Sequence, residues 1–183
     1  MPRFRLPTLA PAAALLLAAA AYAPGHRPRG AQAAALDDPT IVAIFDEANT
    51  ADIETGALAE RMGASQAVRA VGKRFKEDHT GVRQQGRDLA KKLKVTPTPP
   101  KPDTYAADHA KAMTLLKSKK GPEFDRAFLD HEIAYHQAVI DALTKTLLPA
   151  IKNAELKALV EKVAPAFQSH LALAQATKQQ LKL

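Results

Sequence analysis

The sequence predicts an all-α protein whose single folded domain is a bundle of four long helices. Apolar residues recur every three or four positions through most of the chain, and no run alternates as a strand would. Segments rich in Pro and Gly divide this pattern into four long helices and one short helix. A length of 183 residues suits one domain, and the absence of Cys excludes disulfides, thiolate metal sites and cysteine catalysis.

Residues 1–33 have the pattern of a secretory signal peptide, which leaves residues 34–183 as the folded domain. Two arginines precede an apolar segment rich in Ala and Leu, and small residues follow it. Prolines interrupt this segment too early for a membrane-spanning helix, which needs about 20 apolar residues. Cleavage after Ala33 is favoured over cleavage after Ala23, which would leave a proline at the new N-terminus. We therefore expect a periplasmic or secreted protein of the cell envelope without a transmembrane span; an uncleaved anchor is the alternative.

The charge of the expected mature chain is too small to indicate nucleic-acid binding. The whole chain has a net charge of +7, but the leader contains four Arg and no acid, so residues 34–183 hold 22 basic and 19 acidic side chains. Trp is absent and aromatic residues make up only 5% of the chain, which disfavours base stacking. The sequence does not predict an oligomeric state. Two lysine clusters fit solvated helix ends, with an anionic envelope surface or a protein partner as the alternative: Lys91, Lys92 and Lys94, and Lys117, Lys119 and Lys120.

The first two long helices are predicted to be joined by a short turn. The first begins at Asp37, an acidic N-cap that Pro39 follows in the first turn, and it ends at Gly63. Ser65 caps the second helix, which extends to about Leu93. Its apolar residues recur at spacings of three, four and seven, which is typical of a helix that packs in a bundle.

The other two long helices follow a long connection. Residues 95–102, VTPTPPKP, favour an extended, polyproline-like chain, and a short helix is predicted from Tyr105 to Leu116. The third long helix is predicted from Pro122 to Leu148, and the fourth from Asn153 to about Leu181. The connection can cross a bundle about 40 Å long, so we expect one long crossover, the topology of ferritin-like folds. A plain up-down-up-down bundle is the alternative.

Polar residues that interrupt the apolar helix faces mark one candidate site. With the long crossover, five of them lie within about 8–9 Å of one another along the bundle axis. They are Glu54, His79, Glu132, His136 and His170. Two carboxylates and three imidazoles can bind a single divalent ion such as Zn, Cu, Mn or Fe. The alternative, which the sequence favours, is a buried hydrogen-bonded network without an ion. Asp125 also falls on an apolar face, but two turns away from the others.

Four short segments have an order and spacing that resemble a known bacterial family. They are ADIETGALA from Ala51, FKEDHT from Phe75, FDRAFL from Phe124 with His136 beyond it, and His170-Leu171. The resemblance covers about residues 38–181 and is to the domain of unknown function 4142 family, often labelled predicted outer membrane protein. It implies a ferritin-like helical fold and export, and it implies no established activity.

The absence of certain sequence motifs disfavours several kinds of active site. Di-iron bundles carry Glu-x-x-His on two helices, but here Lys76 precedes His79 by three positions and Phe167 precedes His170 by three. No G-x-S-x-G or Walker sequence is present, and Met is too scarce for a Met-rich copper carrier. The favoured interpretation is an exported, non-enzymatic envelope protein. The alternative is a mononuclear metal-binding protein, or an oxidoreductase, that uses the His/Glu cluster.

Overall fold

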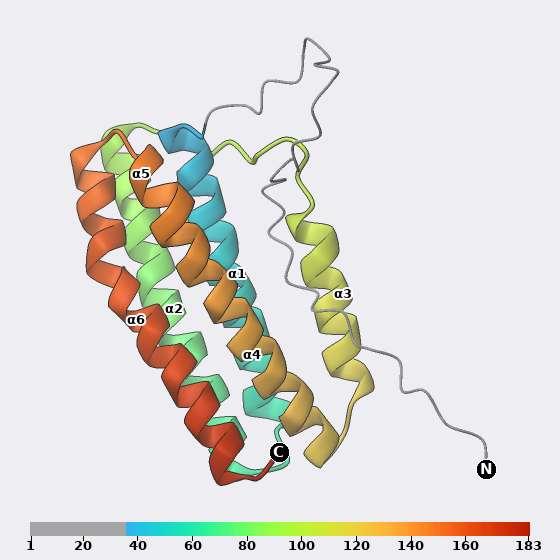
Figure 1. Cartoon of the computed structure of the whole chain (residues 1–183). Coiled ribbons are helices and arrows are strands. Elements are labelled where there is room, and N and C mark those ends of the chain that lie inside the picture. Colours follow the sequence, from blue (N-terminus) through green and yellow to red (C-terminus); the bar gives the residue numbers. More distant parts are fainter. Residues whose placement is uncertain (1–35) are drawn as a thin grey trace, which may run out of the picture.

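The structure, a computed structural model, describes residues 36–183, and most of them are helical (Figure 1). The expected signal peptide lies outside the described residues. Within residues 36–183, no helix combines the length and the apolar composition that crossing a bilayer requires. The long helices are α1 (Asp38–Met62), α2 (Gln66–Leu93), α4 (Pro122–Ala142) and α6 (Ala154–Gln180), and the shorter elements are α3 (Tyr105–Ser118), the π-helix η1 (Leu143–Leu147) and α5 (Leu148–Ala150).

The four long helices form the predicted bundle, which consists of two antiparallel hairpins. α1 and α2 make the first hairpin, and α4 continues through η1 and α5 to the turn that leads into α6 (Figure 1). The connection between the hairpins, residues 94–121, carries α3 along the outside of α1 and α4 to the opposite end of the bundle. α2 and α4 therefore run in the same direction, which confirms the predicted long crossover and its short helix.

Side-chain caps begin three of the long helices where the sequence predicts them. The carboxylate of Asp37 accepts a hydrogen bond from the backbone N–H of Thr40, and the hydroxyl of Ser65 accepts one from the N–H of Val68. The side chain of Asn153 accepts two such bonds in the first turn of α6. These bonds satisfy backbone donors that a helix N-terminus leaves without partners.

The end of the third long helix differs from the prediction of a regular helix to Leu148. Residues 143–147 form a π-helix, in which the N–H of Leu148 donates to the carbonyl of Leu143. Pro149 follows directly; it has no N–H for the carbonyl four residues earlier, and in a regular α-helix its ring would collide with that carbonyl. The wider turn avoids this collision and keeps both Leu143 and Leu147 in the core.

Two apolar clusters fill the bundle, one toward each end, and a polar layer separates them. The cluster near the start of α1 includes Phe45, Val139 and Phe167, and the cluster near its end includes Leu58, Phe75 and Phe128.

α1 and α2 approach closely at Gly56 and Gly72, where a Cβ on either residue would lie 2.6 or 2.7 Å from the carbonyl oxygen of the other. Only glycine permits this approach.

Two aspartates connect the hairpins at opposite ends of the bundle. The carboxylate of Asp125, in the first turn of α4, accepts hydrogen bonds from the backbone N–H groups of Ala64 and Ser65 at 2.7 and 2.8 Å. The carboxylate of Asp38, in the first turn of α1, accepts two bonds of 2.9 Å from backbone N–H groups in the turn before α6. Each aspartate thus binds a turn of the other hairpin, and we call the two aspartates the end clamps.

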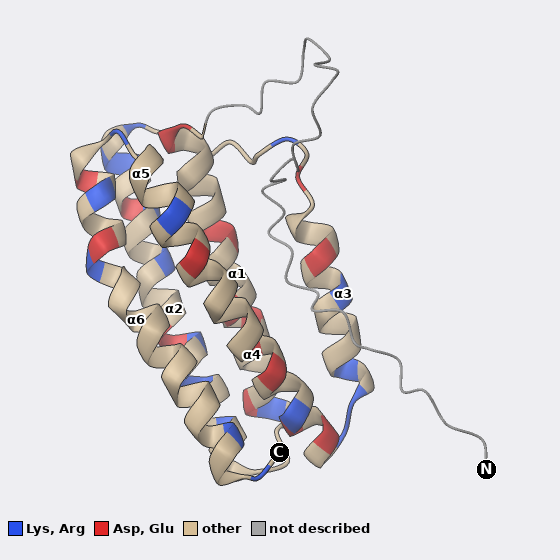
Figure 2. Ribbon diagram, viewed as in Figure 1, with Lys and Arg blue, Asp and Glu red and all other residues tan. Residues whose placement is uncertain are grey.

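The two lysine clusters lie at opposite ends of the bundle, at the C-termini of α2 and α3 (Figure 1). Lysines in a last helical turn complement the helix dipole, and Lys92 also forms an ion pair with Glu155 of α6. Figure 2 shows acidic and basic residues interspersed along the helices. Within residues 36–183, the two lysine clusters therefore do not form one continuous basic surface.

Candidate metal centre

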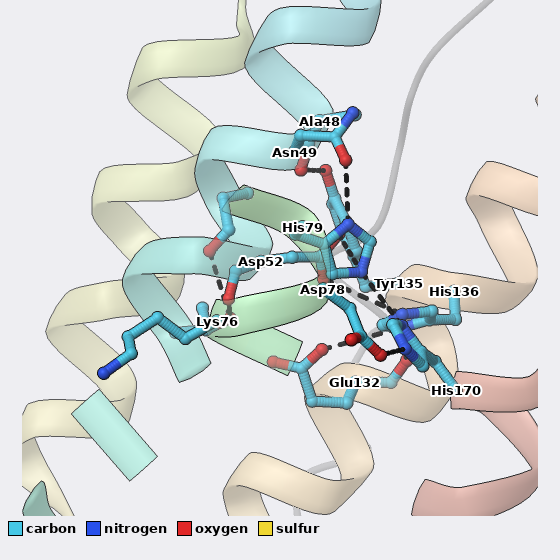
Figure 3. A network of polar contacts seen from close by, with 12 residues as sticks. Ala48, Asn49, Asp52, Lys76, Asp78, His79, Glu132, Tyr135, His136 and His170 are labelled. Atoms are coloured by element: carbon cyan, nitrogen blue, oxygen red, sulfur yellow. Dashed lines mark hydrogen bonds and ion pairs between the residues drawn. The ribbon is translucent and has the colours of Figure 1, made fainter. Parts of the chain in front are cut away.

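The polar layer between the apolar clusters holds five ionisable side chains that come from all four long helices (Figure 3). None of these residues exposes more than 4% of its surface. Aromatic rings enclose them: the ring centroids of Phe75 and His170 are 4.5 Å apart, and those of Phe167 and His79 are 5.1 Å apart. We call this group the interior site; it consists of Asp52, His79, Glu132, His136 and His170.

Four of the five residues singled out in the sequence come together in the interior site: His79, Glu132, His136 and His170. Glu54 does not. Its side chain is 51% exposed, and its carboxylate lies 2.7 Å from Nε2 of His109 on α3. The carboxylate that α1 directs toward the histidines is Asp52, two residues earlier (Figure 3).

The sequence pattern does not single out Asp52 because α1 is enclosed on more sides than its apolar stripe suggests. α1 packs against α2, α3 and α4, so its buried arc widens to include Asn49, Asp52 and Thr55. This row of polar residues at intervals of three, followed by Gly56, is the signal that the sequence offers. Asp125 lies away from the interior site, as its predicted height implies, and serves as an end clamp.

A hydrogen-bond chain fixes the orientation of the His79 ring. The amide nitrogen of Asn49 donates to the backbone carbonyl of Phe45 at 2.7 Å. The amide oxygen of Asn49 is then free to accept from Nδ1–H of His79, at 2.8 Å. A neutral imidazole with its proton on Nδ1 has a free lone pair on Nε2, and this nitrogen faces the other histidines.

The other two histidines are held in the same manner. Nε2–H of His170 donates to the carboxylate of Asp78 at 2.9 Å, which leaves the lone pair on Nδ1. Nδ1–H of His136 donates to the backbone carbonyl of Glu132 at 3.0 Å, and Nε2 of His136 has no hydrogen-bond partner among the described residues. In each ring the protein engages one nitrogen and leaves the other directed inward, as it does for histidines that bind metal ions.

The inward-facing nitrogens converge on one point. Nε2 of His79 and Nδ1 of His170 are 3.0 Å apart, and one nitrogen from each of the three rings lies within 4.8 Å of the others. The hydrogen bonds described above place a lone pair on both nitrogens of the 3.0 Å contact. Two lone pairs at this distance repel one another unless a cation, either a proton or a metal ion, lies between them.

Two carboxyl groups without partners adjoin the histidines. Oδ2 of Asp52 lies 3.5 Å from Nε2 of His79, and Oδ1 of Asp52 lies 3.9 Å from Nε2 of His136. An oxygen of Glu132 lies 3.4 Å from Nδ1 of His136. Within residues 36–183, none of the four carboxyl oxygens has a hydrogen-bond partner. Because buried polar atoms are nearly always bonded, these oxygens are available to a cation.

The buried acids and His136 shift one another's pKa. Burial raises the pKa of Asp52 well above its usual value, and the neighbouring Glu132 adds to the effect. Burial also opposes ionisation of Glu132, but the adjacent His136 ring and the charge of His131 outweigh it and lower the Glu132 pKa. Burial disfavours the charged form of His136, yet Asp52 and Glu132 raise its pKa to about 9. Burial and the neighbouring Glu132 thus disfavour the charged form of Asp52, whereas His136 and Glu132 favour the charged forms of each other.

We expect the metal-free protein to lose stability as the pH falls below 6.5. Burial, with the charges of His136 and His170, lowers the pKa of His79 to about 2. Below pH 6.5 the unfolded chain therefore binds a proton that the folded protein does not, and this group lowers the free energy of unfolding by up to about 1.4 kcal/mol per pH unit. His136 acts oppositely: the stability from its raised pKa is complete below pH 6.5 and is lost as the pH rises through 9.

Urea unfolding with a chelator present, at several values between about pH 7 and pH 5, measures this loss. His79→Gln is the matched variant, because glutamine retains polar atoms but does not titrate. Its free energy of unfolding should depend less steeply on pH than that of the wild type. Equal slopes for the two proteins would show that His79 does not cause the acid sensitivity.

Comparison with known proteins gives a family and no relative with an assigned role. The family model described as Domain of unknown function (DUF4142) matches residues 24–177, a range that includes the whole interior site. No curated protein and no solved structure matches the chain.

Proposed function

The chain belongs to the DUF4142 family, and because that description names no activity, we propose a function from the interior site: the protein binds one divalent transition-metal ion inside its helical bundle. The observation that carries this proposal is the convergence of three imidazole nitrogens, each left facing inward by a hydrogen bond to the other nitrogen of its ring. The proposed donors are Nε2 of His79, Nε2 of His136, Nδ1 of His170 and the carboxylate of Asp52.

The charge of the layer also supports a divalent ion. When Asp52 and Glu132 are both ionised they carry two negative charges, which one divalent ion neutralises, and neutral imidazoles add none. Binding requires the ionised carboxylate of Asp52 and a lone pair on Nε2 of His136, and the raised pKa of each group means that protons compete with the ion there. Because the ion competes with these protons, its affinity should fall in acid.

The donor set favours Zn, Cu, Mn or Fe over the oxygen-seeking ions Ca and Mg. A single ion is supported by the surroundings of His136, which belongs to both groups of potential ligands. Its Nδ1 is engaged by a carbonyl of its own helix, so only Nε2 remains for an ion. Three imidazoles and one carboxylate complete a four-coordinate site without an open position, which supports ion binding rather than catalysis.

We expect added Zn, Cu, Mn or Fe to raise the melting temperature of the wild-type protein relative to the same protein with chelator. The stabilisation should reach about 2.7 kcal/mol at a hundredfold excess of ion over its Kd. His170→Ala removes one proposed donor and should lose this gain. Glu54→Gln is the matched control: it changes an exposed carboxylate outside the site and should retain the gain.

A different result would support a second candidate function. If every ion leaves the wild type unchanged and His170→Ala is merely less stable, the metal proposal fails. The polar layer is then a structural network in a non-enzymatic envelope protein. The chain of contacts from Asn49 through His79 and His170 to Asp78 favours this candidate, because one shared proton between the two rings would complete it without an ion.

We also propose that the protein works in the cell envelope after its leader is removed. The support is the arginine-flanked apolar segment within residues 1–33. Mass spectrometry of a periplasmic fraction should therefore detect a mature N-terminus near Ala34. A chain found only at full length in the cytoplasm would contradict export.

A further inference from the structure

One chain of hydrogen bonds leads from the interior site to the surface of the bundle. Nε2–H of His170 donates to Oδ2 of Asp78 at 2.9 Å (Figure 3), and the same oxygen accepts a bond of 2.6 Å from Nε of Arg74. The side chain of His170 is 4% exposed, that of Asp78 35% and that of Arg74 64%, so exposure rises at each step. Within residues 36–183, the outward hydrogen bonds of the other two histidines end on the buried Asn49 and on a backbone carbonyl. The described hydrogen bonds therefore connect the site with exposed side chains between α2 and α6.

The other three seams between neighbouring helices are packed or covered near the interior site. α1 and α2 meet backbone to backbone at Gly56 and Gly72, about one turn from Asp52. α3 lies over α1 and α4 (Figure 1), and beneath it the hydroxyl of Tyr135 donates to the carbonyl of Ala48 at 3.2 Å. α4 and α6 pack against one another as the two helices of the second hairpin. A hydrated ion thus meets the fewest obstacles between α2 and α6.

The surface beside Asp78 is open. Gly81 follows Asp78 by three positions on α2, and residues with this spacing are neighbours on a helix surface. A Cβ on Gly81 would meet no atom within 4 Å beyond its chain neighbours and the backbone of its own helix. Glycine is a poor helix former, and no close packing accounts for it at this position. The consequence is that no side chain covers Asp78 from position 81.

The backbone of α6 is weakened on the same side of the bundle. Pro165 lies within α6, five residues before His170. It has no N–H to donate to the carbonyl of Glu161, so one hydrogen bond of the helix is missing near His170. The hydroxyl of Ser169 also donates to the carbonyl of Pro165 at 3.0 Å, and bonds of this kind often bend helices. This part of α6 therefore resists a small movement of His170 less than a regular helix would.

We propose that the metal ion enters and leaves the interior site between α2 and α6, past Asp78, and that Arg74 restrains this exchange. The inference rests on the proposed function, because it concerns the exchange of the same ion. Asp78 is the partly exposed acid that contacts a proposed donor residue, so an incoming ion meets its carboxylate first. Arg74 competes with the ion because its positive charge already pairs with this carboxylate. Asp78 is a positioning residue: it binds Nε2–H of His170 and leaves Nδ1 for the ion.

Rates of ion exchange test this path in the full chain. The probe is whichever of Zn, Cu, Mn and Fe raises the wild-type melting temperature most, and stopped-flow mixing with a metal-sensitive dye gives the rate constants of uptake and release. Arg74→Gln removes the competing charge and should speed uptake about threefold or more at low salt, whereas Asp78→Asn should slow uptake by a similar factor. Added salt should reduce both effects. Arg87→Gln is the matched control, because Arg87 forms the same kind of pair with Asp46 farther along α2, and it should exchange the ion as the wild type does.

A side chain placed in the open space beside Asp78 provides the second arm. Gly81→Leu should slow uptake and release by the same factor, about threefold or more, and so leave the Kd unchanged. Loss of a ligand or damage to the fold would change the Kd, so equal slowing of both rates separates an obstructed path from a structural effect. Thr80→Leu, at an exposed position on the opposite side of α2 from Asp78, is the control and should retain both wild-type rates.

Three results would overturn the inference, and they differ in what they leave standing. Wild-type rates in both Arg74→Gln and Gly81→Leu would exclude this path but retain the metal function, provided that ions still stabilise the wild type. Equal changes of rate in the variants and in their controls would show that the effects are not specific to the surface around Asp78. A wild type that takes up none of the four ions would overturn the proposed function and this inference with it.

Discussion

Replacing Phe75 by alanine should lower the free energy of unfolding by about 3–5 kcal/mol. The Phe75 side chain is fully buried in the apolar cluster near the end of α1. Its ring also lies 4.5 Å from the ring of His170 and 5.0 Å from that of His136, so it supports the polar layer as well as the core. Truncation removes apolar contacts and leaves a cavity that a tightly packed four-helix interior cannot close.

Urea unfolding of the metal-free proteins measures the loss from Phe75→Ala. Leu115→Ala is the control: Leu115 is a large apolar residue on α3, but it is 46% exposed, and its truncation should change stability by less than about 0.5 kcal/mol. A loss below about 1 kcal/mol for Phe75→Ala would show that the ring is not a core element.

Asp52→Asn should abolish the stabilisation by metal ions, whereas Glu54→Gln should leave it intact. The two acids are two residues apart on α1, but Asp52 faces the histidines and Glu54 pairs with His109 at the surface. An amide cannot supply the negative charge that a divalent ion attracts. The expected loss equals the full ion-dependent gain, about 2.7 kcal/mol at a hundredfold excess of ion.

In the metal-free protein, Asp52→Asn should leave the free energy of unfolding unchanged or raise it. Burial raises the pKa of Asp52, so the folded wild type is penalised as the pH rises above the usual carboxyl range. The amide that replaces this carboxyl group in Asp52→Asn does not titrate, so the variant should be at least as stable as the wild type near pH 8 with chelator. Thermal melting with and without ion separates the two effects. A variant that is destabilised equally in both conditions would indicate damage to the fold rather than loss of a ligand.

Much of the fold follows from local signals in the sequence. Asp37, Ser65 and Asn153 cap the helices that they were expected to cap, and the length of the connection from Lys94 to Gly121 allows the observed crossover. The π-helix does not follow from apolar periodicity. It depends on how one proline is accommodated within a packed helix, which is a property of the three-dimensional surroundings.

The interior site could be predicted only in part for a related reason. Counting residues from the turns places His79, His136 and His170 within about 8–9 Å of one another along the bundle axis, because helical rise is regular. The same count cannot distinguish Asp52 from Glu54, which differ in height by only about 3 Å. Which of them faces inward depends on how many neighbours surround α1, and apolar periodicity assumes a single buried face.

The end clamps determine how the two hairpins are aligned along the bundle axis. Packed helices can slide along one another, and a slide of one turn is about 5.4 Å, more than the 4.8 Å within which the three ring nitrogens lie. Asp38 and Asp125 each bind a turn of the opposite hairpin, one at either end. Movement of one hairpin along the other in either direction would break hydrogen bonds at both ends. Two residues at the extremities of the molecule thereby set the axial alignment of side chains at its middle.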